Sequence, residues 1–269
     1  MLPLRPTRVA REAAVNPRVR EYGAGDGPAR VLLHGWGFDG AVMEPLARAL
    51  APAGRVLTID LPGFRCGDVR APGTDVDVLA DAVMQAAPET AHWAGWSLGG
   101  LVALAAAQRY PRRVAGVDLV ASTPRFPAAT GWPGIAVDEL DGFRAAVCAD
   151  PETAHRRFLG FQLAGSESAR PVLRRLRALA ERNGLPSQRA LADGLAILRE
   201  TDLRTRLSAL SCPVRALLGG ADPLVPAALE PHLSAAGVEV RVIPGAGHVP
   251  FLSHPHAVYE ALKQPAAPA

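Results

Sequence analysis

The segment Gly95-Trp96-Ser97-Leu98-Gly99 places a serine between two glycines in the pattern Gly-x-Ser-x-Gly. An apolar segment precedes it and an alanine-rich run, 101–107, follows, an order that predicts a strand, a sharp turn and a helix. Such a turn holds the serine in a strained backbone conformation, and a Cβ at either glycine would collide with a neighbouring element. The motif alone is a weak signal, because a nucleophilic serine also needs a base, an acid and an oxyanion hole.

Asp222 and His248 have the residue types and the order along the chain that this chemistry requires. Each directly follows a predicted strand, as Ser97 does. A histidine takes the proton of the serine hydroxyl, and an acid fixes the tautomer of that histidine. Taken singly, Asp222 could cap a loop and His248 could be a structural turn residue. In this order and at strand ends, we interpret Ser97, Asp222 and His248 as a catalytic triad.

Two backbone N–H groups are predicted to form the oxyanion hole. The apolar run 30–33 ends in His34-Gly35-Trp36-Gly37, and the loop after such a strand is where a hydrolase of this type places one donor. We predict the N–H of Trp36 as that donor and the N–H of Leu98 as its partner. We interpret His34 as a structural residue that fixes the loop by hydrogen bonds. The side chain of Trp36 either packs in the core or forms a pocket wall.

Apolar runs alternate with helical patterns along most of the chain. Because these runs are continuous rather than alternating, they predict an α/β fold with a mostly parallel, doubly wound sheet. Ligands bind at the carboxyl ends of the strands in such sheets. Strands are expected at 30–33, 55–60, 91–94, 114–120, 212–220 and 238–243, and helices at 43–50, 74–87 and 255–262.

The pattern changes between residues 124 and 205, where helical stretches follow one another without a convincing strand. We predict an all-helical lid inserted into the sheet, because lids exclude water and shape substrate sites. The expected helices are 137–149, 151–163, 166–182 and 186–200. The predicted domains are a core of 20–123 and 206–269, a lid of 124–205, and a disordered N-terminal extension of 1–19.

Composition narrows the class of protein. We find no run of 18 apolar residues and no secretory signal. The net charge of +3 comes almost wholly from arginines that alternate with acids, which favours codon bias over a nucleic-acid surface. Cys66, Cys148 and Cys212 show neither disulfide nor metal spacing, and we expect them to be reduced and mostly buried. We expect a cytoplasmic monomer with no metal, no organic cofactor, no nucleic-acid partner and no membrane attachment.

Several segments together carry a family resemblance: 32–37, 60–64, 95–103, 132–135, 157–170 with its Arg-Phe-Leu and Ala-Arg sequences, 194–204 and 248–255. On these segments, over about residues 20–263, the chain resembles the α/β-hydrolase superfamily and, more narrowly, the BioH family of biotin-pathway carboxylesterases. The resemblance implies hydrolysis of a methyl ester at the end of a seven-carbon acyl chain carried by acyl-carrier protein, with smaller esters as further substrates.

The resemblance also implies roles for residues of the lid. It places the segment Phe158, Leu159, Gly160, Phe161 and Gln162 in the substrate channel, and Arg157, Arg170 and Arg174 at carrier-contacting positions. The spacing puts Arg170, Arg174 and Arg177 on one helix face, and a basic face suits an acidic carrier. The alternative is a solvated face in an arginine-rich protein. Thr153 stands where the family has a further arginine, and Arg65-Cys66 where it usually has Gly-Arg-Ser.

The triad does not separate this reaction from others on the same fold, because specificity lies in the lid and channel. The alternatives are a general short-chain carboxylesterase and a hydrolase of lactone or C–C bonds. A third alternative is a non-catalytic binding protein with the hydrolase fold. Such proteins typically lack a triad member, whereas all three are present here.

Overall fold

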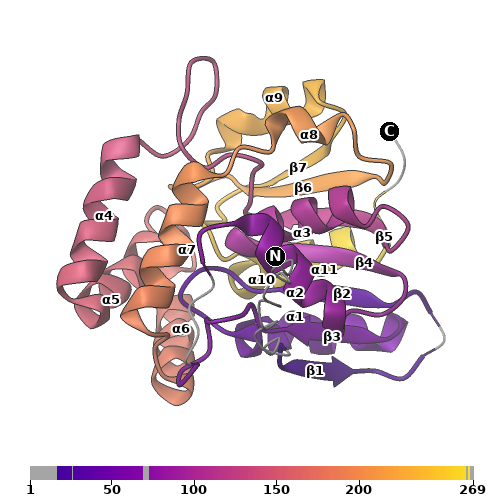
Figure 1. Ribbon diagram of the computed structural model, residues 1–269, viewed down its shortest axis with the longest axis horizontal. Helices are drawn as coiled ribbons and strands as arrows, with labels where there is room; N and C mark the ends of the chain where they lie inside the picture. The colour runs from indigo at the N-terminus through magenta and orange to yellow at the C-terminus, as the bar shows by residue number, and fades with distance from the viewer. Residues whose placement is uncertain (1–16, 26, 69–72, 265, 267–269) are drawn as a thin grey trace, which may run out of the picture.

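A seven-stranded sheet forms the centre of the molecule (Figure 1). The computed structural model describes residues 17–25, 27–68, 73–264 and 266. The strand order is β1-β3-β2-β4-β5-β6-β7, and every neighbouring pair is parallel except β1 with β3. This confirms the predicted α/β class with a mostly parallel sheet. The strands are β1 (Val19–Tyr22), β2 (Arg30–Leu33), β3 (Val56–Ile59), β4 (Ala91–Trp96), β5 (Val114–Val120), β6 (Val214–Gly219) and β7 (Glu239–Ile243).

Helices cover both faces of the sheet. Consecutive side chains of a strand point to opposite sides, so a strand of continuous apolar residues makes both faces apolar. In β2, Val31 and Leu33 belong to the apolar cluster formed with α2 and α3, whereas Leu32 belongs to the cluster formed with α1 and α11. No helix in the described part of the chain is long and apolar enough to cross a membrane. The helices are α1 (Glu44–Leu50), α2 (Val76–Ala86), α3 (Leu98–Arg109), α4 (Val137–Ala149), α5 (Pro151–Phe161), α6 (Ala169–Asn183), α7 (Gln188–Glu200), α8 (Arg204–Leu207), α9 (Glu230–Ala235), α10 (Pro250–Ser253) and α11 (Pro255–Leu262), with 3-10 turns at Gly40–Met43, Ala51–Ala53 and Ala227–Leu229.

The four helices α4 to α7 follow β5 in the chain and precede β6, and they lie together at one end of the molecule, on the left in Figure 1. Helix α6 shows why this segment stays helical and docks. Its Val172 and Leu176 are buried while the arginines between them are exposed, which is the pattern of a helix packed on one side only. The lid role and the domain limits stay predictions. The predicted N-terminal extension lies outside the described residues except for its last three, of which Val19 begins β1.

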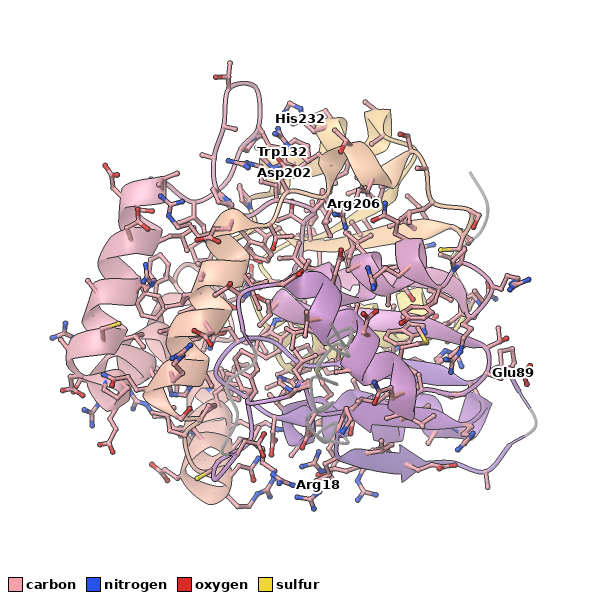
Figure 2. All side chains as sticks on the ribbon, viewed as in Figure 1. Arg18, Glu89, Trp132, Asp202, Arg206 and His232 are labelled. Atoms are coloured by element: carbon pink, nitrogen blue, oxygen red, sulfur yellow. The ribbon has the colours of Figure 1, made fainter. Side chains whose placement is uncertain are left out.

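A protruding loop, 124–136, connects β5 to α4 and carries two isolated β-bridges, Pro127 with Ile135 and Ala129 with Trp132. Trp132 anchors this loop: the guanidinium of Arg204 lies 5.3 Å from its ring centroid and the ring of His232 lies 5.7 Å away. Figure 2 shows Trp132 and His232 close together at the top of the view. The anchored loop holds Phe126 and Ile135 on either side of its tip, and both line the cavity described below.

The cysteines differ from the prediction. All three are free, but Cys66 and Cys148 are exposed and Cys212 is only half-buried. Cys148 lies in the last turn of α4, a helix whose buried residues are Leu140 and Val147, so its thiol is directed away from the core. The expectation that the cysteines are mostly buried was wrong.

Candidate active site

Ser97 lies at the sharp turn between β4 and α3, with the strained backbone angles φ 53° and ψ −118°. The predicted need for two glycines is confirmed. A Cβ at Gly95 would overlap the backbone of Gly99, and a Cβ at Gly99 would lie 2.6 Å from the carbonyl oxygen of Leu33. The hydroxyl of Ser122 donates to the Ser97 carbonyl at 2.6 Å and supports the turn from β5. The strain therefore comes from close packing on both sides of the serine.

The structure brings Ser97, His248 and Asp222 into one hydrogen-bonded chain. The Nε2 of His248 lies 2.9 Å from the Oγ of Ser97, and its Nδ1 lies 2.8 Å from the Oδ2 of Asp222. Because a carboxylate only accepts, Nδ1 carries the proton and Nε2 is free to accept the proton of the serine. The other oxygen of Asp222 accepts from the N–H groups of Leu224 and Val225, which holds the carboxylate in place.

The loop that carries His248 is held by two further contacts. The indole N–H of Trp96 donates to the carbonyl of His248 at 2.7 Å. The N–H of His248 donates to the carbonyl of Gln162, which directly follows α5, at 3.0 Å. Gln162 thus contacts His248 through its backbone. Its own side chain is fully buried and is not among the residues that line the cavity.

The loop 34–37 lies directly beside the serine: a Cβ at Gly35 would lie 3.2 Å from the Cβ of Ser97. The N–H groups of Trp36 and Leu98 donate to no acceptor in the described part of the chain, although both residues are buried. Buried N–H groups without a partner are rare in proteins, so this pair is a candidate site for an acceptor from outside the chain. The two groups that we predicted as oxyanion donors therefore lie next to the nucleophile and are free to donate.

His34 fixes this loop, as we predicted. Its Nδ1 donates to the carbonyl of Gly35 at 2.9 Å, and its Nε2 accepts from the N–H of Leu61 at 2.8 Å. Full burial lowers the pKa of His34, so its ring stays neutral in this arrangement. The carbonyl of Gly35 belongs to the same peptide unit as the N–H of Trp36, so His34 sets the direction of that N–H.

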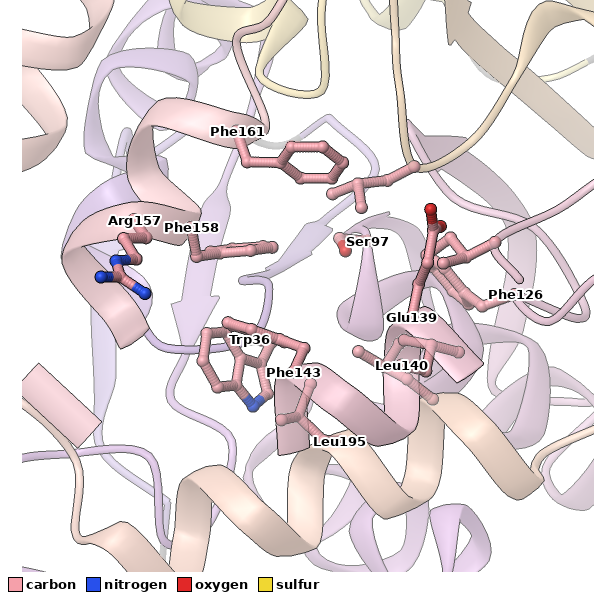
Figure 3. A pocket seen from close by; sticks show the side chains of 13 residues that line it. Trp36, Ser97, Phe126, Glu139, Leu140, Phe143, Arg157, Phe158, Phe161 and Leu195 are labelled. Carbon is pink, nitrogen blue, oxygen red and sulfur yellow. The ribbon is translucent and has the colours of Figure 1, made fainter. Parts of the chain in front are cut away.

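A cavity of about 390 Å³ opens onto Ser97 between the sheet and the inserted helices (Figure 3). Its wall is apolar apart from the serine, Glu139 and Arg157, and these two charged side chains lie on opposite sides of Ser97 in Figure 3. Of the predicted channel segment, Phe158 and Phe161 line the cavity, whereas Leu159, Gly160 and Gln162 do not. The lining residues are Trp36, Ser97, Phe126, Ile135, Glu139, Leu140, Phe143, Arg157, Phe158, Phe161, Leu195, Leu198 and Leu224.

Sequence reasoning missed the walls contributed by α4, α7 and the loop 124–136. Leu140 of α4 and Leu195 of α7 are apolar residues on the inner face of amphipathic helices. That pattern is the same for a helix packed on a core and for one that lines a cavity. Phe126 and Ile135 flank the tip of the loop, where no periodicity is present. Only the position of these residues in the fold distinguishes them.

The predicted carrier-contacting arginines lie on the surface. Arg157 lies at the end of the cavity, and Arg170 and Arg174 are exposed on α6. None of these three, nor Arg177, forms an ion pair within the described residues. In the same part of the chain no three His, Cys, Asp or Glu side chains are grouped so that they could hold a metal ion.

Comparison with known proteins connects this site to a family. The family model described as "Alpha/beta hydrolase family" matches residues 31–261. A pimeloyl-[acyl-carrier protein] methyl ester esterase of Edwardsiella ictaluri is 41% identical over 234 residues, which is 86% of this chain and 90% of that protein. The protein of the same name from Aeromonas hydrophila is 42% identical over 245 residues, covering 89% of this chain and 95% of its own.

Solved structures resemble the fold at lower identity. An esterase from Exiguobacterium antarcticum has a TM-score of 0.81 and 24% identity, covering 91% of this chain and 93% of its own. A hydrolase from Pseudomonas aeruginosa has a TM-score of 0.76 and 27% identity, covering 91% of both chains. The likeness to the first of these concerns the fold alone.

Proposed function

The chain belongs to the alpha/beta hydrolase family, and we propose that it hydrolyses the methyl ester of pimeloyl-acyl-carrier protein, a reaction of biotin synthesis. One observation supports the chemistry above all: the hydroxyl of Ser97 is hydrogen-bonded to His248 and opens into an apolar cavity. The substrate is inferred from relatives of 41–42% identity that are named for this activity.

The reaction proceeds in two halves. His248 accepts the proton of Ser97 as the Oγ attacks the ester carbonyl, and Asp222 stabilises the imidazolium that forms. The tetrahedral intermediate collapses, the C–O bond to methanol breaks, and the proton on Nε2 passes to the leaving methoxide. A water molecule, deprotonated by His248, then attacks the acyl-enzyme. The second tetrahedral intermediate collapses and releases the free carboxylate, and His248 returns the proton to Ser97.

The oxyanion of both tetrahedral intermediates is bound by the N–H groups of Trp36 and Leu98. Both groups are without an acceptor among the described residues, so neither has to break a hydrogen bond when negative charge develops on the oxygen. Each such donor is worth about 3–4 kcal/mol of transition-state stabilisation in comparable enzymes. Trp36 is further held by its indole N–H, which donates to the carbonyl of Leu191 in α7 at 2.8 Å.

The cavity suits an acyl chain without a free charge. Aromatic side chains of Trp36, Phe143 and Phe158 lie within 5.0–5.5 Å of one another, measured between ring centroids, and form an apolar wall beside the serine. We propose that the methylene chain lies along this wall and that α4 to α7 act as a lid. The carrier protein, which is acidic, then docks on the exposed arginines of α6 and on Arg157.

The decisive experiment compares the methyl ester of pimeloyl-acyl-carrier protein with the same ester free of carrier. We expect both to be hydrolysed, with a higher kcat/KM for the carrier-linked form, and we expect Ser97→Ala to abolish both activities. The gene should also restore biotin-free growth to cells that lack their own pimeloyl-ester hydrolase. A folded wild-type protein that fails to restore growth, or that hydrolyses short esters with equal efficiency, would indicate the general esterase instead.

A further inference from the structure

His155 of α5 is a buried histidine outside the triad, and it contacts the oxyanion loop. The residue is only 4% exposed, and its Nε2 lies 3.0 Å from the carbonyl oxygen of Gly37. The ring also packs against those of Trp36 and Phe38, with centroids 5.9 and 5.6 Å away. A residue of the inserted helices therefore contacts three consecutive residues, Trp36 to Phe38, of the segment 34–38, which carries one proposed oxyanion donor and is called the oxyanion loop below.

The direction of this hydrogen bond is set by its acceptor. A carbonyl oxygen only accepts, so the Nε2 of His155 carries a proton and donates. Burial lowers the pKa of His155 to about 4, with the bond to Gly37 opposing the shift in part, so the ring is neutral at neutral pH. The contact is a neutral hydrogen bond of fixed direction.

The oxyanion loop needs such a contact because the backbone of Gly37 has a left-handed conformation. Gly37 has φ +76°, a conformation that favours glycine, and a Cβ there would lie 2.8 Å from the ring of His155. A glycine in this region is flexible unless its peptide groups are bonded. His34 holds the peptide on one side of Trp36 through the Gly35 carbonyl. His155 holds the Gly37–Phe38 peptide, two peptide units further along the loop, and its ring packs against that of Trp36.

We propose that His155 is a positioning residue, which holds the N–H of Trp36 in the oxyanion hole by donating from Nε2 to the carbonyl of Gly37. This inference rests on the proposed ester hydrolysis but not on the identity of the acyl carrier. It means that the oxyanion hole is completed by an inserted helix and not by the core alone.

Helix α5 contacts the proposed catalytic machinery at two points, which makes this assignment specific. His155, in its first half, bonds to the oxyanion loop, and Gln162, directly after its last residue, accepts from the N–H of His248. Phe158 lies between them and lines the cavity (Figure 3). A chain bound against Phe158 therefore stabilises the helix that keeps both the oxyanion donor and the catalytic histidine in place.

The test compares His155→Leu, which keeps apolar volume without a donor, with His155→Gln, whose amide nitrogen can reach the same carbonyl. The substrate is p-nitrophenyl acetate, and the probe is phenylboronic acid. The boron forms a bond to the Oγ of Ser97, and the tetrahedral adduct places an oxygen in the oxyanion hole. We expect His155→Leu to lower kcat about tenfold to a hundredfold with little change in KM, as for a misplaced oxyanion donor. The inhibition constant of the boronate should rise by a similar factor, and His155→Gln should recover most of both losses.

Val147→Ala is the matched control, because Val147 is fully buried in the inserted helix α4 and does not line the cavity. It should lower stability without changing kcat or boronate affinity. The inference is overturned if His155→Leu keeps the wild-type kcat and boronate affinity, or if Val147→Ala loses as much of both. A folded wild type that neither hydrolyses the ester nor binds the boronate would instead overturn the proposed function.

Discussion

At the scale of single residues, Asp222 allows the charge of a side chain to be tested separately from its position. One of its oxygens bonds to Nδ1 of His248 and the other accepts two backbone N–H groups. Asp222→Asn keeps the shape but replaces an acceptor by a donor, so His248 would turn to the other tautomer or lose the bond. We expect kcat to fall about 10⁴-fold.

The measurement is the steady-state hydrolysis of a p-nitrophenyl ester together with circular dichroism of the variant. The spectrum should match that of the wild type, because the fold around residue 222 does not depend on the charge. A variant with more than a tenth of the wild-type kcat would show that Asp222 is not the acid of the triad.

The buried ring of His155 should also make the free energy of unfolding depend on pH. Its pKa is about 4 in the folded protein and about 6.5 in an unfolded chain. Below pH 6.5 the unfolded state therefore binds a proton that the folded state does not, and the free energy of unfolding falls as the pH is lowered towards 4. Between pH 7 and pH 5 this residue alone lowers the free energy of unfolding by about 2 kcal/mol.

Urea unfolding at pH 7 and pH 5 tests this, with His155→Gln as the comparison. The variant should lose less stability than the wild type over the same interval, by about 2 kcal/mol. Burial also lowers the pKa of His34 and of His92, but these residues contribute equally to both proteins. Equal pH dependence in the two proteins would contradict the prediction.

At the scale of elements, prediction from the sequence succeeded where a pattern of side chains is compatible with only one kind of secondary structure. The run Arg30–Leu33 is a strand as expected, because four consecutive buried residues fit a sheet covered on both faces. The strand Val19–Tyr22 was not predicted. It alternates half-buried and exposed residues at the sheet edge and includes Arg20 and Glu21, so its apolar signal is weak.

That Ser97, Asp222 and His248 come together was predictable for the same reason, since each follows a strand whose end lies at one edge of the sheet. Their catalytic roles stay a proposal. The role proposed for His155 was not predictable. Along the sequence it is one polar residue in an amphipathic helix, and its contact with Gly37 joins positions 118 residues apart. A role of this kind depends on how the inserted helices pack, which local patterns do not specify.

Helix α6 yields a prediction about the carrier. Arg170, Arg174 and Arg177 lie on one face of it, whereas Arg175 and Arg182 lie on another, in a groove beside α1. Reversing the charge of the first face by Arg170→Glu with Arg174→Glu should lower kcat/KM for the carrier-linked ester about tenfold at low salt, because steering of the acidic carrier is lost. The kcat/KM for the free ester should not change.

The control is Arg175→Glu with Arg182→Glu, the same change of charge on the same helix but on the other face. It should affect the carrier-linked ester much less. Both effects should shrink as salt is added, since exposed charges are screened over about 8 Å at physiological ionic strength. If both pairs of substitutions lower kcat/KM for the carrier-linked ester equally, then the carrier does not dock on the first face, or only the net charge of the protein matters.

At the scale of the whole molecule, the active site is assembled from parts that are far apart in the chain. The proposed nucleophile and its triad partners follow β4, β6 and β7, one proposed oxyanion donor lies in the loop after β2, and α4, α5 and α7 contribute to the cavity wall. The core and the inserted helices therefore share one cavity. A ligand in that cavity contacts both.

This arrangement predicts that a ligand stabilises both parts together. At a concentration 100 times its Kd, an apolar boronate should raise the free energy of unfolding by about 2.7 kcal/mol. For a chain of this size that corresponds to a rise in Tm of roughly 5–10 °C. Because α5 is bonded to the loops of Gly37 and His248, calorimetry should show a single transition that shifts as a whole. Two transitions of which only one shifts would mean that the inserted helices unfold independently of the sheet, and that the contacts of His155 and Gln162 are too weak to join them.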